Sequence, residues 1–172
     1  RSMLGTETFV RTQMETVLAS LEREAGSLVP AGVRQWCERE AARLAGHFEA
    51  RRAGGFVREC HGDLHLDNIV RKGNDAILFD CIEFSEALRW IDVASDLAFL
   101  MMDLQAHGRD DLASALLNGW LQRTGDFGAL PALRFYLVYR ALVRALVEVL
   151  KARGSSAADG LARARDYVAC AA

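Results

Sequence analysis

Residues 61–68, with the sequence HGDLHLDN, place a carboxylate and an amide five positions apart, and a further aspartate follows at Asp80. Phosphoryl transfer from a metal nucleotide uses such a set of side chains. One aspartate accepts the proton of the attacking hydroxyl, while an asparagine and a second aspartate bind the metal ions that neutralise the phosphate charges. The spacing therefore predicts Asp63 as the catalytic base and Asn68 and Asp80 as magnesium ligands.

Two short apolar segments follow this loop directly. Residues 69–72 (IVRK) and 76–79 (AILF) flank the turn-forming cluster 73–75 (GND), so we predict a β-hairpin. Asn68 enters the hairpin and Asp80 leaves it, and because the strands of a hairpin are antiparallel, its two open ends lie side by side. We therefore expect both side chains to meet at one Mg²⁺ ion, which prefers oxygen ligands and often takes only one or two from the protein.

Helical periodicity covers most of the rest of the chain. We predict helices at residues 7–24, 30–53, 91–105, 110–123 and 131–153 and from 155 onward, with a short strand at 56–60. The predicted fold class is α+β, mainly α-helical, with the functional residues carried by a small β-hairpin. With 51% hydrophobic and 26% charged residues, residues 1–172 suit a single domain.

Composition argues against several classes of protein. The net charge of −2, with basic residues scattered among acids, gives no field that would attract nucleic acid. The four cysteines have no paired C-x-x-C spacing, so we expect packed thiols rather than disulfides or a zinc ribbon, and a reducing, cytoplasmic location. The apolar stretches are interrupted too often to cross a membrane.

Three segments carry a family resemblance: HGDLHLDN at 61–68, ILFDCIEF at 77–84 and RWIDVASDLAFL at 89–100. Together they resemble the C-terminal lobe of the aminoglycoside phosphotransferase family, small-molecule kinases related in fold to protein kinases. The chain is most similar to the branch described as bifunctional aminoglycoside phosphotransferase/ATP-binding proteins, in which this lobe precedes a separate P-loop kinase domain. The resemblance extends from about Glu7 to Lys151.

The resemblance implies roles for individual residues. Asp63 corresponds to the catalytic base, Asn68 and Asp80 to the ligands of the metal and its nucleotide, and Asp96 to a buried aspartate that braces the loop. Asp96 lies in the apolar run 93–98 (VASDLA), where an unpaired carboxylate would be costly to bury, so we expect it to bind the loop backbone.

Further polar residues surround these positions. We expect His61 to orient the loop through a hydrogen bond, Asp67 to serve local turn geometry, and His65 to be exposed as readily as buried. Glu83 is an additional site candidate, and Glu86 and Asp103 could meet the ammonium groups of a cationic substrate. Three further charged residues recur every four positions on the helix predicted at 131–153 and predict a solvated face: Arg140, Arg144 and Glu148.

The chain also departs from a complete kinase of this family. No phosphate-covering glycine loop and no strand lysine precede the catalytic loop, where the sequence is helical instead. The expectation is one lobe that works with an N-terminal nucleotide-clamping lobe, and with a downstream P-loop domain, in a longer chain. Its cofactors would be Mg²⁺ and ATP or GTP, its substrate a small hydroxylated molecule, and the lobe alone would be weakly active.

Two other functions remain open from the sequence. Histidine and aspartate alternate at 61, 63, 65 and 67, which a zinc- or iron-dependent hydrolase could use to activate water. This hydrolase would leave Asn68, Asp80 and the hairpin without a role. The absent clamping lysine fits a non-catalytic, pseudokinase-like binding module.

Overall fold

The computed structural model describes residues 3–152 and 157–171. The helices are α1 (Glu7–Ala25), α2 (Val33–Arg43), α3 (Ala45–Ala53), α4 (Glu86–Arg89), α5 (Val93–Ala106), α6 (Asp110–Thr124), α7 (Leu130–Ala152) and α8 (Ala157–Ala171). The strands are β1 (Val57–Glu59), β2 (Ile69–Lys72), β3 (Asp75–Leu78) and β4 (Trp90–Asp92). Single 3-10 turns occur at Gly26–Leu28, Leu66–Asn68 and Phe127–Ala129. The predicted α+β, mainly helical class is confirmed.

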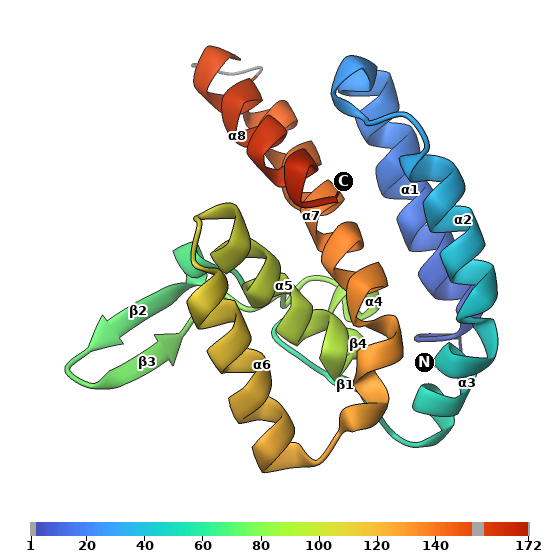
Figure 1. Cartoon of the computed structure of the whole chain (residues 1–172), viewed down its shortest axis with the longest axis vertical. Helices are drawn as coiled ribbons and strands as arrows, with labels where there is room; N and C mark the ends of the chain where they lie inside the picture. Colours follow the sequence, from blue (N-terminus) through green and yellow to red (C-terminus); the bar gives the residue numbers. More distant parts are fainter. Residues whose placement is uncertain (1–2, 153–156, 172) are drawn as a thin grey trace.

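Helix α7 is the centre of the packing. It contacts α1 on one side, α5 on another and α8 along much of its length (Figure 1). Phe135, Val138 and Leu142 are among its fully buried residues. An α-helix that is apolar on most sides must be surrounded by other elements, and α7 meets this condition.

The first helices form a layer beside α7. Thr6 caps α1 by accepting a hydrogen bond from the Phe9 amide, and α1 buries Met14, Leu18 and Leu21 along one face. The helix predicted at 30–53 is divided in two, since α2 ends at Arg43 and α3 begins at Ala45. Leu44 at the division adopts φ −90° and ψ 0°, and Gly46, a poor helix former, follows it.

Two small antiparallel sheets hold the segments on either side of the loop 61–68. Strand β1 pairs with β4 in the register Val57 to Asp92, so residues 91 and 92, predicted as the start of a helix, belong to a strand instead. Helix α5 starts only after them, because the Asp92 carboxylate accepts the Ala94 amide at 2.9 Å and caps the helix. Pairing with a distant strand thus overrides the local helical pattern.

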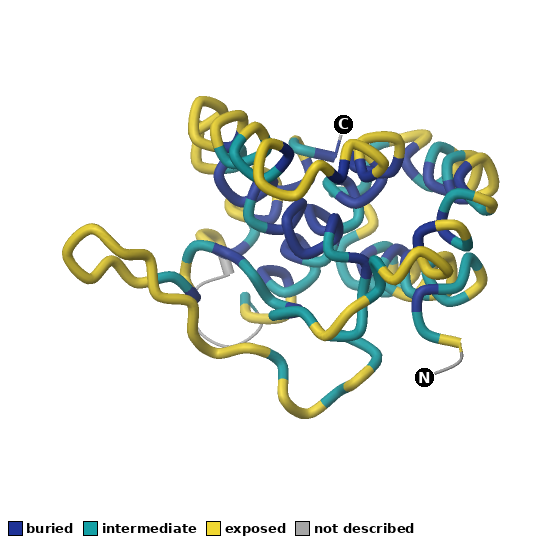
Figure 2. The backbone as a smooth tube through the Cα atoms, turned by 90° about the horizontal axis from the view of Figure 1, so that it is seen from below, coloured by how far each residue is buried: buried dark blue, intermediate teal, exposed yellow. Residues whose placement is uncertain are grey.

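The hairpin of β2 and β3 is confirmed. Ile69 pairs with Leu78, and Lys72 pairs with Asp75 beside the turn. Figure 2 shows the hairpin extending away from the helical body as an exposed segment. Its exposed apolar side chains include Val70, Ile77 and Leu78. Residues 68 and 80 stand where the hairpin joins the body.

A buried ion cluster fastens α3 to the start of α5 and the end of α6. Arg51 donates through Nε and Nη2 to the Asp92 carboxylate, and through Nη1 (2.9 Å) and Nη2 (2.8 Å) to that of Asp126. All three side chains are about 5% exposed or less. The guanidinium also lies 4.2 Å from the centre of the Phe56 ring. The two bidentate pairs use four of the five N–H donors of the arginine.

Within the described ranges, no helix combines the length and the apolar character needed to span a lipid bilayer.

We predict that Arg51→Met destabilises the fold by about 3–5 kcal/mol, because it leaves two buried carboxylates without a counter-charge. The matched control is Arg52→Met, whose exposed arginine pairs with Glu49 at the surface, so its loss should change the free energy of unfolding little. Urea unfolding of both variants measures the difference. Equal free energies of unfolding would contradict the structural role of the cluster.

Candidate active site

Backbone amides at the start of the loop 61–68 bind a buried carboxylate of α5. The two oxygens of Asp96 accept hydrogen bonds from the amides of His61 (2.9 Å) and Gly62 (3.0 Å). Asp96 is 9% exposed, and these bonds supply the partners that a carboxylate in an apolar helix requires. The first turn of α5 therefore fixes where the loop begins.

A second carboxylate two turns along α5 holds the middle of the loop. Asp103 accepts the Leu66 amide at 2.8 Å through Oδ2. Between the two carboxylates, the Phe99 ring packs against the ring of His65 at 5.7 Å between centres. Asp103 is 1% exposed and also accepts the Tyr167 hydroxyl, so its predicted contact with a cationic substrate is wrong.

The opposite side of the loop meets buried arginines of α7. Arg140 donates through Nη1 to the Gly62 carbonyl and through Nε to Ser95, and its guanidinium lies 4.6 Å from the centre of the Phe99 ring. The prediction of a solvated face on this helix is wrong, since Arg140, Arg144 and Glu148 are only 3–5% exposed. In the sequence, the apolar residues on both sides of these three charged residues were the signal that α7 is surrounded by other helices.

Gly62 is required by both its backbone and its surroundings. Its φ is +83°, a region that side-chain-bearing residues rarely adopt, and an added Cβ would lie 2.9 Å from the Leu88 carbonyl oxygen and 3.2 Å from Cδ1 of Ile82. The segment 82–89 therefore closes directly over the start of the loop.

Asp63, His65 and Asn68 form a contiguous polar set. Nδ2 of Asn68 donates to the carbonyl of Asp63 at 2.9 Å and to its Oδ2 at 3.2 Å, and His65 Nε2 lies 3.3 Å from the same Oδ2. The two oxygen acceptors fix the orientation of the Asn68 amide, so its Oδ1 points away from Asp63. The sequence left open whether His65 is buried or exposed. The structure shows it buried, with an exposed fraction of 5%.

The charge state of Asp63 follows from these neighbours. Partial burial alone would raise its pKa. The hydrogen bond and charge of His65, the charge of Arg144 and the hydrogen bond from Asn68 together outweigh burial and lower the pKa below its ordinary value. Asp63 is therefore ionised at neutral pH and able to accept a hydrogen bond from a hydroxyl group.

The open end of the hairpin brings Asp80 to the same region. The Phe79 amide donates to the Asn68 carbonyl at 3.1 Å, so Asp80 follows directly after the residue that pairs with Asn68. Asp80 is exposed and has φ +59°, an unusual conformation for a residue other than glycine. Such strain often occurs at functional sites.

An open cleft of about 610 Å³ joins the loop to the segment after the hairpin. Asp63, Asp80, Glu83 and Phe84 line it, so Glu83 lies beside the two aspartates. The structure thus places the predicted base and one predicted metal ligand on one cleft, with Asn68 bonded to the base. Their catalytic roles stay predictions.

His61 ties the loop to the hairpin. Its Nε2 lies 2.8 Å from the carbonyl oxygen of Phe79, and its own carbonyl accepts the Ile82 amide at 3.0 Å. These contacts agree with an orienting side chain. Asp67 is exposed, with Oδ2 3.5 Å from Arg144 Nη2.

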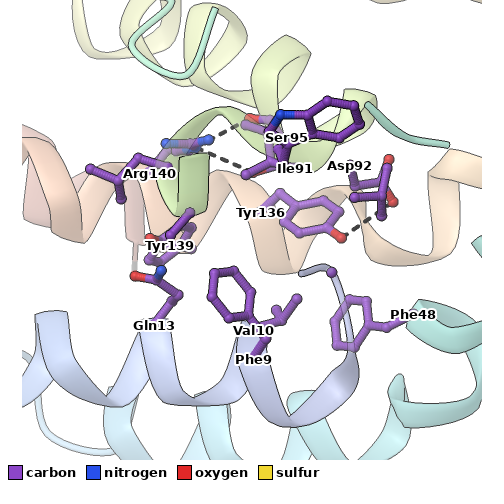
Figure 3. A pocket seen from close by; sticks show the side chains of 15 residues that line it. Phe9, Val10, Gln13, Phe48, Ile91, Asp92, Ser95, Tyr136, Tyr139 and Arg140 are labelled. Carbon is purple, nitrogen blue, oxygen red and sulfur yellow. Dashed lines mark hydrogen bonds between the residues drawn. The ribbon is translucent and has the colours of Figure 1, made fainter. Parts of the chain in front are cut away.

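A second, apolar pocket lies between α1, α7 and β4 (Figure 3). Phe9, Val10, Tyr136, Tyr139 and Arg140 are among the side chains around it. Its free volume of about 40 Å³ has room for only a few water molecules, far less than the open cleft beside Asp63. The larger cleft beside Asp63 is therefore the candidate active site.

The geometry gives the hydrolase alternative no support. In the part of the chain that the structure describes, no three His, Cys, Asp or Glu side chains are grouped so that they could hold a metal ion. The alternating residues of the loop have other partners, since His61 bonds the hairpin backbone and His65 packs on Phe99. The oxygen atoms of Asn68 and Asp80 suit the sparse protein coordination of Mg²⁺.

Comparison with known proteins identifies the family of the chain. The family model for the phosphotransferase enzyme family (APH) matches residues 5–136, well over half of the sequence, and the chain belongs to this family. Membership indicates a kinase-like phosphotransfer function with a nucleotide phosphate donor and usually a divalent metal.

The relatives are themselves without an assigned activity. Uncharacterized protein Rv2004c and Uncharacterized protein MT2060 of Mycobacterium tuberculosis and Uncharacterized protein Mb2027c of Mycobacterium bovis are each 36% identical over 138 residues. The match covers 78% of this chain, but the chain spans only 28% of the length of these relatives. No solved structure gives a significant match.

We predict that Gly62→Ala costs more stability than Gly108→Ala. Both glycines have positive φ, +83° and +69°, which costs an L-residue about 1–2 kcal/mol, but an added Cβ at Gly108 meets open space. The clash with Leu88 should add about 1–3 kcal/mol at Gly62. Thermal or urea unfolding measures both, and equal losses would contradict the close approach described here.

The cysteines allow a test of local exposure. Burial raises the pKa of Cys37 to about 11, and burial with the charges of Asp96 and Asp92 raises that of Cys60 to about 12. Cys81, expected to be packed, is instead exposed and lines the cleft.

At pH 8, a thiol with a pKa of about 12 is ionised to only about one part in ten thousand. We therefore predict that iodoacetamide modifies Cys81 at least a hundredfold faster than Cys37 or Cys60, as judged by peptide mass spectrometry. In urea all four cysteines should react, which serves as the control. Equal rates in the folded protein would show that the region of the cleft is packed differently.

Proposed function

We propose that this chain is the catalytic lobe of an ATP- and Mg²⁺-dependent phosphotransferase that phosphorylates a hydroxyl group of a small molecule. The observation that carries the proposal is the single cleft that receives Asp63 from the loop and Asp80 from the end of the hairpin, with Asn68 bonded to Asp63. Family membership supplies the reaction class, and these side chains are the ones that the reaction requires.

Asp63 is suited to receive the proton of the acceptor hydroxyl. His65 and Asn68 both contact its Oδ2, which leaves Oδ1 without a partner among the described residues and available to the substrate. As the acceptor oxygen forms its bond to the γ-phosphorus, its proton moves to Asp63, and the bond from the γ-phosphorus to the nucleoside diphosphate breaks. The lowered pKa of Asp63 keeps the carboxylate ionised until that moment.

Asn68 and Asp80 would hold the metal. Oδ1 of Asn68 is directed away from Asp63 by the amide orientation, and the Asp80 carboxylate is exposed on the cleft. Two oxygen ligands are enough for Mg²⁺, which takes its remaining ligands from phosphates and water. When bound, the Mg²⁺–nucleotide supplies the transferable phosphoryl group and the charge neutralisation.

We further propose that the lobe works within a longer protein. The cleft is open, and the sequence before it folds as α1, α2 and α3 rather than as a strand-rich nucleotide clamp. The mycobacterial relatives extend far beyond the matched region, since it makes up 28% of their length. An N-terminal clamping lobe and a P-loop kinase domain, as in the bifunctional branch of the family, are the proposed additions.

We predict that Asp63→Asn lowers kcat for phosphoryl transfer by about 10²–10⁴-fold in the full-length protein, because the amide cannot accept the proton. Asp75→Asn, the same change at an exposed position of the hairpin, should leave kcat within about twofold of wild type. The measurement is ATP consumption with a panel of hydroxylated acceptors. Wild-type activity in Asp63→Asn would rule out its assignment as base.

A further inference from the structure

The helices that follow the family-matched region reach the catalytic loop through buried polar contacts. The match ends at residue 136, in the first part of α7, so the rest of α7 and all of α8 lie beyond it. Side chains from this outer part nonetheless connect to Leu66 and His65 of the loop. Two routes can be followed from α8 to the loop.

The first route runs from Tyr167 through Asp103. The Tyr167 hydroxyl donates to Oδ1 of Asp103 at 2.7 Å, and Oδ2 of the same carboxylate accepts the Leu66 amide at 2.8 Å. Tyr167 is 5% exposed and Asp103 is 1% exposed, so water competes little for these bonds. A carboxylate held at both oxygens has one orientation, and that orientation fixes the Leu66 backbone.

The second route runs from Arg144 through His65. The Arg144 guanidinium lies 5.3 Å from the centre of the Tyr167 ring, and its Nη1 is 3.4 Å from His65 Nε2, which is in turn 3.3 Å from Oδ2 of Asp63. Nη2 of Arg144 is also 3.5 Å from the carboxylates of Asp67 and Glu148. The arginine thus contacts two residues of the loop.

Helix α8 keeps these groups in register with α7. Arg163 of α8 donates to Glu148 at 2.7 Å, and Glu148 is buried beside Arg144. An added Cβ at Gly160 would lie 2.7 Å from Cβ of Ala152, so the two helices approach closely there. The close packing therefore leaves little freedom in the position of α8 relative to α7.

Stability alone gives a weak reason for such a network. Buried ion pairs often stabilise a fold no better than apolar side chains of similar size. The contacts described here end on the backbone and side chains next to the catalytic base rather than at remote positions. A role in fixing the geometry of the loop 61–68 accounts for both the charged side chains of this network and its position next to the loop.

We propose that Tyr167 and Arg144 are positioning residues, through which the C-terminal pair of helices sets the geometry of the catalytic loop. The proposal rests on the proposed phosphotransferase function. Tyr167 acts through Asp103 on Leu66, and Arg144 acts through its contacts with His65 and Asp67 and through its positive charge near Asp63. Neither side chain touches the substrate in this assignment, so their removal acts on kcat and leaves binding nearly unchanged.

The test uses Tyr167→Phe in the full-length protein. This change removes one oxygen, keeps the ring beneath Arg144, and should lower kcat about tenfold to a hundredfold while KM for both substrates stays within about twofold. Hydrogen exchange, read by mass spectrometry in peptides that cover residues 61–68, should become about tenfold faster. Arg144→Met should lower kcat similarly, and Arg144→Lys should recover part of the loss.

The matched control is Tyr139→Phe, since the described residues include no hydrogen-bond partner for the Tyr139 hydroxyl. It should leave kcat and the exchange of residues 61–68 as in wild type. Equal behaviour of the Tyr167→Phe and Tyr139→Phe variants overturns the proposal, as does faster exchange with an unchanged kcat.

The Asp63→Asn variant distinguishes failure of the positioning role from failure of the proposed phosphotransferase function. If it abolishes activity while Tyr167→Phe does not, only the positioning role fails, whereas wild-type activity in Asp63→Asn overturns the function and the positioning role together.

Discussion

The binding of loop amides by buried carboxylates of α5 is the interaction on which the rest of the site depends. Asp96 accepts the amides of His61 and Gly62, and Asp103 accepts that of Leu66. Hydrogen bonds to charged groups contribute about 1.5–3 kcal/mol each, and removing either carboxylate would leave partly or fully buried amides without partners. The loop therefore takes its shape from a helix that contributes none of the side chains assigned to the reaction.

Helix α7 supplies the counter-charges to this arrangement. Gly62 shows the result most directly, because its amide binds Asp96 of α5 and its carbonyl binds Arg140 of α7. The loop is thus held between an acidic face and a basic stripe, each buried. Arg51 pairs with Asp92 and Asp126 in a similar buried ion cluster, about one turn before Asp96, at the N-cap of α5 where strand β4 meets β1.

The sequence predicted the local parts of the site well. The hairpin, the loop and the residues that enter and leave the hairpin follow from apolar alternation, turn residues and spacing, which are short-range signals. The buried charges of α7 were assigned to solvent because their spacing of four also describes an exposed ion pair. Whether α7 has an exposed face depends on how many helices surround it, and strand β4 depends on pairing with β1, about thirty residues away. Such tertiary context is absent from local patterns.

The residues assigned to the reaction and the residues that position them lie in different parts of the fold. The residues assigned to the reactants, Asp63, Asn68 and Asp80, lie on the loop and at the base of the hairpin, next to the open cleft that Asp63 and Asp80 line. Residues that determine their geometry lie on long helices, where packing holds each side chain in place. Glu83 and Phe84 line the cleft from the exposed segment that follows the hairpin, whereas the carboxylates and guanidiniums that hold the loop are buried in the helices behind it. Under the proposed function, a substitution in this exposed segment would alter the surface that faces the acceptor and leave the buried contacts of the loop in place.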